Sequence, residues 1–288
     1  MNYTHGMSKR MVHLNGQLVP AAEAQISVAD AAVLHGFSAF TTMRAHKGKV
    51  FRLGAHIARV LATAELLSMP YRPTAEDLAA AMAEVLDAND LQDARCRMTL
   101  TAGGADAPPS VFVTAEPMPP RPRHWDEPGI VAVISSFHQE PGHLMFGYKT
   151  GCYAERVLSV REAAAKGAEE AVWFTRDGRL AEGGFCNVFA VVDGVVRTPP
   201  RDTPVLPGIA RQAVLELCGE LGIESDAESP VTGREVLDAE ELFLTASTSG
   251  IRPVRQLEQH VYGDGAPGKI TRWLVEGWAK LLDRECGR

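Results

Sequence analysis

A proline-rich segment divides the chain. Residues 115–129, AEPMPPRPRHWDEPG, contain five prolines. Proline has no backbone N–H donor and fixes φ, so this stretch can be neither a helix interior nor a central strand. We therefore expect a linker over residues 119–129. It would join a smaller N-terminal domain, residues 1–118, to a larger C-terminal domain, residues 130–288.

Hydrophobic periodicity and turn residues predict alternating strands and helices on both sides of this linker. In the N-terminal part we expect a hairpin turning at 15–16, a second turn at 47–48, helices over 55–68 and from 75, and strands at 97–101 and 111–115. In the C-terminal part we expect strands at 130–137, 171–175, 179–182, 186–192, 194–198 and 241–247, and helices over 149–166, from 209 and over 268–284. The fold class is mixed α/β without the regular β-α-β rhythm of a doubly wound sheet.

Composition excludes several classes of protein. The chain has 288 residues, 45% of them hydrophobic, and a net charge of -7. An acidic chain without a basic run is a poor partner for nucleic acid or anionic lipid. The five cysteines are scattered and form no C-x-x-C pair, which argues against a disulfide framework and a structural zinc site. Without an apolar secretory signal in MNYTHGMSKRMVHLNG, we expect a cytoplasmic protein.

Common catalytic motifs are also missing. The chain has no G-x-x-x-x-G-K-[ST], no H-E-x-x-H and no G-x-S-x-G. The nine histidines show no ligand spacing, so we expect no metal. Hydrolase and metalloenzyme functions are therefore not favoured.

One lysine lies in apolar and aromatic company where a helix is expected to start. It is Lys149, in F-G-Y-K-T-G-C-Y, and Tyr153 follows four residues later on the same face if the helix has begun. A desolvated lysine beside a phenol can form a Schiff base. The alternative is an ordinary solvated lysine at a helix start.

Two further segments carry groups that suit a flat, charged ligand. Glu182 precedes two glycines and is followed by Asn187 on a strand, so its carboxylate could face a cationic ring nitrogen. Pro207-Gly208 opens a helix whose first amides belong to Ile209 and Ala210, which suits a phosphate. The alternatives are a turn with a surface glutamate and an ordinary capped helix.

A fourth segment, T-A-S-T-S-G-I-R-P-V at residues 245–254, places hydroxyls at a strand end. In order and spacing, the four segments resemble the fold-type IV pyridoxal-phosphate (PLP) enzymes, the class IV aminotransferases. L-N-G-Q and F-T-T-M-R…G-K-V-F-R-L-G-A-H-I-A-R-V match that family as well. The family includes branched-chain and D-amino-acid aminotransferases, (R)-amine transaminases and aminodeoxychorismate lyase. The resemblance implies a two-domain fold, PLP as cofactor and a homodimer.

The resemblance also assigns roles at the cofactor ring. Lys149 would bind PLP as an imine and then carry a proton between the substrate Cα and C4′ of the cofactor. Glu182 would pair with the pyridine nitrogen and keep it protonated. Tyr153 matches a phenol near O3′, Leu206 matches the apolar residue on the ring face, and Asn187 is expected among the cofactor contacts.

The phosphate would be held by four residues under the same resemblance. They are Arg59 in H-I-A-R, the amides of Ile209 and Ala210, and the hydroxyl of Ser247. Many relatives have Thr or Ser where this chain has Ala210. One side-chain hydrogen bond is lost there, worth about 1.5–3 kcal/mol to a charged partner, while the backbone amide remains.

The residues matched to the substrate carboxylate favour an aminotransferase. Arg97 falls where branched-chain enzymes place an arginine, and Thr248 and Ser249 fall where relatives present amides; as an alternative, Arg97 is a strand surface residue. Ala102, in T-A-G-G, replaces the arginine of D-amino-acid aminotransferases. We therefore expect transfer of an amino group between a branched-chain-like amino acid and a 2-oxo acid.

The early strand supports a different member of the family. F-T-T-M-R, residues 40–44, departs from the F-E-G-I-R of branched-chain enzymes and resembles aminodeoxychorismate lyase. The alternative activity is therefore a lyase that forms 4-aminobenzoate and pyruvate. A PLP-free binding protein would need neither Lys149 nor Glu182, and the presence of both argues for an enzyme.

Overall fold

The chain divides into two compact units in a computed structural model that describes residues 10–203 and 205–287. Unit 1 holds the described residues up to Pro119, with Lys149–Cys152 and the segment from Leu282 onward. Unit 2 holds Pro120–Tyr148 and Tyr153–Leu281. The sequence analysis placed Lys149–Cys152 and the segment from Leu282 onward in the larger C-terminal domain. In the structure, both segments belong to unit 1. None of the described helices is both long and apolar enough to cross a membrane.

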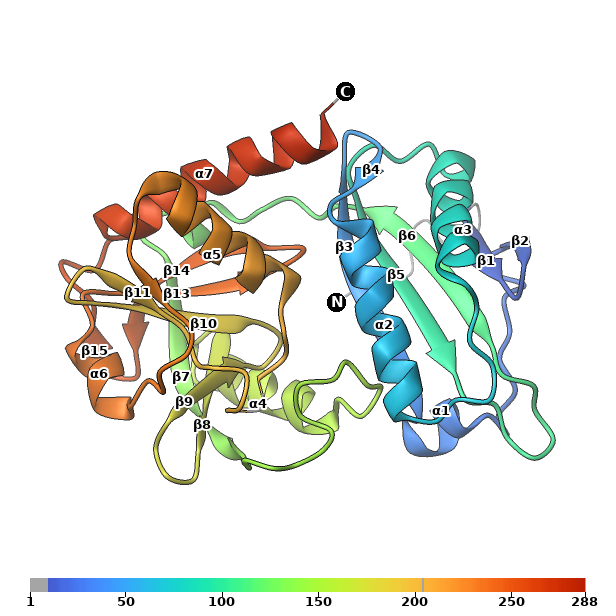
Figure 1. Cartoon of the computed structure of the whole chain (residues 1–288), viewed down its shortest axis with the longest axis horizontal. Helices are drawn as coiled ribbons and strands as arrows, with labels where there is room; N and C mark the ends of the chain where they lie inside the picture. Colours follow the sequence, from blue (N-terminus) through green and yellow to red (C-terminus); the bar gives the residue numbers. More distant parts are fainter. Residues whose placement is uncertain (1–9, 204, 288) are drawn as a thin grey trace. The chain divides into compact units, whose positions relative to one another are not determined.

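Unit 1 is an antiparallel sheet with helices on it. Its described strands run in the order β2-β1-β6-β5-β3-β4. They are β1 (Met11–Leu14), β2 (Gln17–Pro20), β3 (Ser38–His46), β4 (Lys49–Val50), β5 (Ala94–Thr101) and β6 (Val111–Pro117). The helices are α1 (Ala31–His35), α2 (Leu53–Leu66) and α3 (Ala75–Ala88). Helices α2 and α3 lie on one face of the sheet (Figure 1).

Local sequence explains several of these elements. Asn15 and Gly16 both have positive φ, as the tight turn between β1 and β2 requires, so the predicted hairpin is confirmed. Thr74 and Asp77 form a capping box at the start of α3, which confirms the predicted N-cap. The helix expected over 55–68 is α2.

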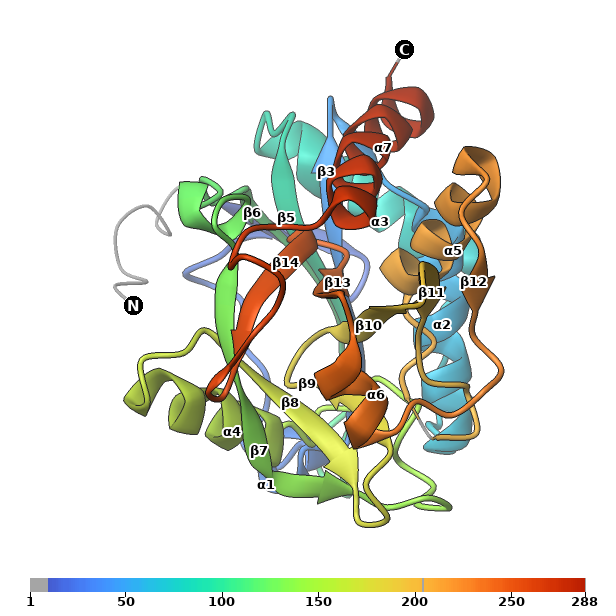
Figure 2. The same cartoon turned by 90° about the vertical axis from the view of Figure 1, so that its left-hand side faces the viewer.

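Unit 2 is built on a sheet that closes on itself. Strands β10, β13, β14, β7, β8 and β9 pair in that order, and β9 also pairs with β10 (Figure 2). The described strands are β7 (Ile130–Gln139), β8 (Glu170–Thr175), β9 (Leu180–Gly183), β10 (Asn187–Val192), β11 (Val195–Arg197), β12 (Ser225–Asp226), β13 (Glu241–Ala246), β14 (Gly250–Leu257) and β15 (His260–Val261). The closed part encloses a core that includes Val172, Leu180, Val188, Leu244 and Val254.

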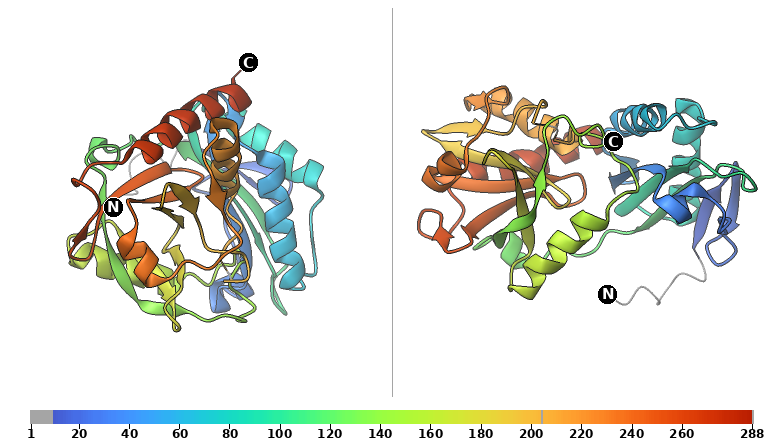
Figure 3. Two further views of the ribbon diagram at one scale, coloured as in Figure 1. Left: turned by 60° about the vertical axis from the view of Figure 1, so that its left-hand side comes forward. Right: turned by 90° about the horizontal axis from the view of Figure 1, so that it is seen from below.

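Helices of unit 2 cover this sheet. They are η2 (Arg123–Trp125), α4 (Ala154–Ala165), α5 (Ile209–Leu221), α6 (Gly233–Asp238) and the part of α7 (Lys269–Cys286) up to Leu281. Helix α4 connects the parallel strands β7 and β8 and packs on both (Figure 3). This crossover places the residues that follow Lys149 beside the strand that carries Glu182.

Two predicted elements differ from the structure. The helix expected over 149–166 begins only at Ala154, because Lys149–Thr150 is paired with β3 instead. Phe40 N donates to Lys149 O at 3.0 Å, and the pairing is long-range, so no local pattern reveals it. Tyr153 and Lys149 therefore do not share a helical face. Strand β6 also extends into the proline-rich segment. Pro117 is its last residue, and at this end position the strand needs no backbone N–H to pair with its neighbour.

Candidate active site

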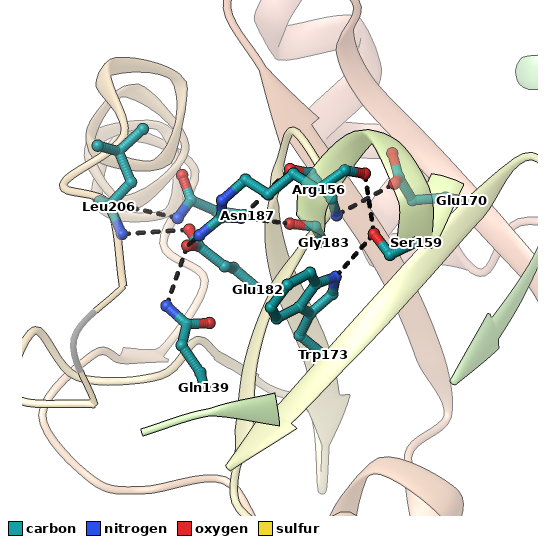
Figure 4. A network of polar contacts seen from close by, with 10 residues as sticks. Gln139, Arg156, Ser159, Glu170, Trp173, Glu182, Gly183, Asn187 and Leu206 are labelled. Atoms are coloured by element: carbon teal, nitrogen blue, oxygen red, sulfur yellow. Dashed lines mark hydrogen bonds and ion pairs between the residues drawn. The ribbon is translucent and has the colours of Figure 1, made fainter. Parts of the chain in front are cut away.

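Glu182 is the centre of a buried polar network in unit 2 (Figure 4). Its side chain, on β9, is 3% exposed. Oε1 accepts hydrogen bonds from Gln139 Nε2 at 3.1 Å and from Arg156 Nη2, and Oε2 accepts from Leu206 N at 3.1 Å. A carboxylate offers roughly four acceptor positions, so these donors leave one position for a further N–H. The alternative of a surface glutamate in a turn is wrong.

Asn187 also binds the loop that contains Leu206. It pairs with Glu182 across β9 and β10, and its Nδ2 donates to Leu206 O at 2.9 Å. A Cβ at Gly208 would overlap Asn187 Oδ1, far inside the 3.0 Å limit of real contacts. Glycine is therefore required at this close approach. Together these contacts bring Glu182, Asn187, Leu206 and the start of α5 to one place.

The start of α5 can bind an anion. Gly208 is the N-cap and has no side chain to bond the first free amides, which include those of Ile209 and Ala210. Both residues are buried, and the Ala210 side chain brings no hydroxyl to the site. A helix of this length, with uncapped N–H groups, favours negative charge at its N-terminus.

The hydroxyl-rich segment forms the turn between β13 and β14. Ser247, Thr248 and Ser249 are partly buried there. Arg121, from the proline-rich segment, donates from Nη1 to Ser249 O and from Nη2 to Ile251 O at 2.6 Å. Arg121 thus holds the turn in place through these two backbone carbonyls.

Arg156, on α4, is fixed by more than Glu182. Its Nη1 donates to Gly183 O at 3.1 Å and to Gly184 O at 3.2 Å. Its guanidinium carbon lies 5.3 Å from the centre of the Trp173 ring. Burial opposes the charge of Arg156, but the Glu182 carboxylate, together with Tyr153 and Cys186, outweighs it, and the pKa of Arg156 is raised.

A second buried ion pair supports the glycines after Glu182. Arg252 Nη2 donates to Glu170 Oε2 at 2.7 Å, and Gly184 N donates to Glu170 Oε1 at 3.1 Å. Cys186 Sγ contacts the same carboxylate, and burial, followed by the Glu170 charge, raises the pKa of this thiol well above its usual value. The thiol stays protonated, and the Gly183–Gly184 backbone has fixed partners on both sides.

Tyr153 precedes the first turn of α4. Its ring stacks on Phe185, with the centroids 5.7 Å apart and the planes at 10°. The guanidinium carbon of Arg156 lies 5.8 Å from the same tyrosine ring. Tyr153 thus belongs to the surroundings of the Glu182 network.

Lys149 lies in unit 1, above an aromatic ring. Its Nζ is 4.8 Å from the centre of the Phe40 ring, and Cζ of Arg97 is 3.8 Å from the same centre. Its backbone N donates to Thr63 Oγ1 at 3.4 Å. Arg97 is half-buried and donates from Nε to Thr99 Oγ1 at 3.1 Å. The β5 arginine and the lysine therefore both lie close to the Phe40 ring.

Arg59 is linked to a buried histidine through a hydroxyl. Its Nη2 donates to Thr41 Oγ1 at 3.1 Å, and Thr41 Oγ1 lies 2.7 Å from His56 Nδ1. Burial, then the charges of Arg59 and Lys149, hold the pKa of His56 well below its usual value. His56 is therefore neutral, and the Thr41 hydroxyl accepts from Arg59 while it also shares a hydrogen bond with His56 Nδ1.

Comparisons with known proteins decide the family. The family model described as amino-transferase class IV matches residues 38–257. This chain belongs to the class IV aminotransferases. It is 34% identical to a putative branched-chain-amino-acid aminotransferase of Methanocaldococcus jannaschii over 274 residues, which cover 92% of this chain and 94% of the relative.

Solved structures of class IV aminotransferases have the same fold. The branched-chain aminotransferase of Escherichia coli matches with a TM-score of 0.90 and 28% identity over 96% of both chains. That of Thermobaculum terrenum, solved in its PLP form, matches with a TM-score of 0.86 and 25% identity over 97% of this chain and 96% of the other. The predicted family, fold class and aminotransferase activity are confirmed, and these comparisons do not favour the lyase.

Sequence reasoning missed several residues around this aminotransferase's candidate site. Arg156 lies three residues after Tyr153, but only the fold shows that it reaches Glu182. Gln139 and Glu170 are far away in sequence, and their contacts with residues 182–184 come from the closed sheet. His56 is the first residue of the matched H-I-A-R motif, and this motif could have indicated its role. In the structure, His56 contacts Arg59 through Thr41. Among the described residues, no group of three His, Cys, Asp or Glu side chains could hold a metal ion.

Proposed function

We propose that this aminotransferase uses PLP to move an amino group between a branched-chain-like amino acid and a 2-oxo acid. The observation that carries the proposal is the surroundings of Glu182. A buried carboxylate with one acceptor position left lies against a loop that leads into an uncapped helix start. These are partners for a protonated ring nitrogen and for a phosphate, the two charged ends of PLP.

The proposed roles follow the family resemblance. Lys149 attaches the cofactor covalently and moves the proton at the substrate Cα. Glu182 accepts a hydrogen bond from the ring nitrogen, while Asn187 and Leu206 hold the loop at the ring. Bound PLP supplies the electron sink for this chemistry. Tyr153 is proposed to lie near the O3′ oxygen.

The phosphate is proposed to bind one guanidinium, two backbone amides and a hydroxyl. Arg59 supplies the guanidinium, oriented by Thr41 and His56. Ile209 and Ala210 supply helix N-terminal amides, and Ser247 a hydroxyl. Ala210 offers its amide only, so its contribution to phosphate binding is smaller than that of a threonine.

The substrate carboxylate is proposed to bind Arg97 and the turn at Thr248 and Ser249. Support comes from the relatives, which are named branched-chain aminotransferases, and from Arg97 lying beside Phe40 with Lys149 on the same ring. Arginine holds a carboxylate with two parallel hydrogen bonds, which gives orientation as well as affinity.

A panel of L- and D-amino acids with 2-oxoglutarate or pyruvate tests the proposal. We expect valine, leucine and isoleucine to yield their 2-oxo acids, with the acceptor converted to its amino acid, as measured by mass spectrometry. If no amino acid reacts, but aminodeoxychorismate yields 4-aminobenzoate and pyruvate, the proposed activity is wrong and the lyase is correct.

The assembly is proposed to be a homodimer in the cytoplasm. The described cysteines are free thiols, which suits a reducing compartment. Val28, Val33 and Leu34 are large apolar residues exposed close together in the chain of unit 1, Val28 by 80%. The side chains of residues 37–44, in contrast, are buried or partly buried. The exposed residues at 28–34 are therefore the better candidates for a subunit interface.

A further inference from the structure

Arg156 gives Glu182 an internal counter-charge. The carboxylate is 3% exposed and the arginine side chain 14% exposed, and the two form an ion pair within unit 2. Glu182 therefore already has a cationic partner besides the amide donors of Gln139 and Leu206. A buried carboxylate with such a partner is a weaker proton acceptor than one without it.

Arg156 is held in place independently of Glu182. Its other nitrogen bonds two backbone carbonyls, those of Gly183 and Gly184. Gly184 is in turn fixed by Glu170, whose carboxylate pairs with Arg252. To leave Glu182, Arg156 would have to give up charge-assisted hydrogen bonds in a site where water cannot replace them.

The neighbouring rings restrict the guanidinium further. Trp173 lies beneath it at 5.3 Å and donates from Nε1 to Ser159 Oγ at 3.1 Å. Ser159 Oγ donates to Arg156 O at 2.9 Å, which ties the ring to the same helical turn. The side chain thus has one well-packed position, with its Nη2 on Glu182 (Figure 4).

Resting on the proposed function, we propose that Arg156 stays on Glu182 when PLP is bound and shares the carboxylate with the pyridine nitrogen. A carboxylate facing a cation stabilises its protonated form, and a second cation on that carboxylate weakens this effect. The ring nitrogen therefore loses its proton at a lower pH than it would if Glu182 had no arginine partner. Arg156 is a positioning residue that acts through Glu182 and sets the strength of the electron sink.

The protonation of the ring nitrogen can be measured directly. The wild-type enzyme and its variants are loaded with PLP labelled with ¹⁵N in the ring, and the nitrogen chemical shift is followed from pH 5 to pH 10. For Arg156→Met, we expect the midpoint to rise by about one pH unit or more. Arg156→Lys keeps a charge and should stay closer to the wild type.

Arg161→Met is the matched control. Arg161 lies on the same helix but is exposed, so its loss should leave the midpoint where it is in the wild type. Equal midpoints in wild type and Arg156→Met would overturn the proposal. If Arg156→Met does not fold, Arg156→Gln replaces it as a neutral, polar variant with the same expected direction.

A crystal structure of the wild-type holoenzyme is a second test of the proposal, and it needs no variant. Arg156 Nη2 within hydrogen-bond distance of Glu182 Oε1 supports the proposal, and a guanidinium withdrawn from Glu182 overturns it. Failure of the proposed function is distinguishable: a protein that takes up no PLP would overturn both ideas. PLP uptake with an unchanged midpoint would overturn only the role of Arg156.

Discussion

At the scale of single residues, the Thr41 hydroxyl connects Arg59 to a neutral, buried His56. Thr41→Val keeps the shape of the side chain but removes the hydroxyl that accepts from Arg59 and shares a hydrogen bond with His56. We expect a loss of about 1–3 kcal/mol in the free energy of unfolding. We also expect about tenfold weaker PLP binding, equal to ~1.4 kcal/mol. Urea unfolding and fluorescence titration of the apoenzyme measure the two effects.

Thr41→Ser is the control for that prediction, because it restores the hydroxyl without the methyl group. We expect it to recover most of the PLP affinity lost in Thr41→Val. If the serine and valine variants bind PLP equally weakly, the hydroxyl does not orient Arg59 and the proposed link is wrong.

His56 also makes stability depend on pH. Its pKa in the folded protein lies well below the 6.5 of the unfolded chain, because of burial and then the charges of Arg59 and Lys149. Below pH 6.5 the unfolded chain therefore binds a proton that the folded protein does not. Above pH 6.5, His56 is neutral in both states and does not lower the free energy of unfolding. Below pH 6.5, the free energy of unfolding falls by about 1.4 kcal/mol per pH unit until the folded pKa of His56 is reached.

His56→Asn removes this titration and keeps a polar atom near Thr41. We expect the difference in unfolding free energy between wild type and His56→Asn to change between pH 5 and pH 7, with the wild type losing more on acidification. Urea unfolding at several pH values measures it. Parallel curves for the two proteins would refute the prediction.

At the scale of elements, helix α5 offers a matched pair of glycines. A Cβ at Gly208 would overlap Asn187 Oδ1, whereas a Cβ at Gly219, inside the helix, meets nothing within 4 Å. We expect Gly208→Ala to cost about 1–3 kcal/mol of stability and to weaken PLP binding. We expect Gly219→Ala to stabilise the protein by about 0.5–1 kcal/mol. Thermal unfolding and PLP titration of both variants test this, and equal behaviour would contradict the site geometry.

Elements formed by neighbours in sequence were predictable, and long-range ones were not. The hairpin at Asn15-Gly16 and the cap at Thr74 depend on a few adjacent residues, and both are present. The segment at Lys149 reads as a helix start but pairs with β3, more than a hundred residues away. The pairing of β7 with β14 in the sheet of unit 2, which aligns Ile130 with Val254, likewise joins residues more than a hundred positions apart.

The candidate site follows the same division. Glu182, Asn187 and Leu206 were expected as ligand contacts from the sequence motifs and the family resemblance, and the structure brings these three together. Arg156 was not expected, because a helix residue reaches a strand residue only after α4 has crossed between β7 and β8. A sequence motif identifies groups that touch a ligand more readily than the groups that orient them.

At the scale of the whole molecule, the proposed homodimer depends on the exposed apolar residues at 28–34. Light scattering at micromolar concentration should give twice the mass of one chain, 31.1 kDa. Val28→Asp combined with Leu34→Glu should shift the protein to the monomer, because charges would be buried without partners at an interface. Val261→Asp, at an exposed apolar position in unit 2, is the control. A fully active wild-type monomer would refute the proposed assembly.

The central claim is that Lys149 carries the cofactor, and borohydride reduction of the holoenzyme tests it most directly. Reduction should fix a pyridoxyl group on the peptide that contains Lys149, abolish the visible absorbance of the cofactor, and leave Lys149→Ala unlabelled but folded. Lys166, exposed just after α4, is the nearest rival in the sequence. Peptide mass spectrometry that finds the adduct on Lys149 supports the account, and an adduct on Lys166, or none on any lysine, would contradict it.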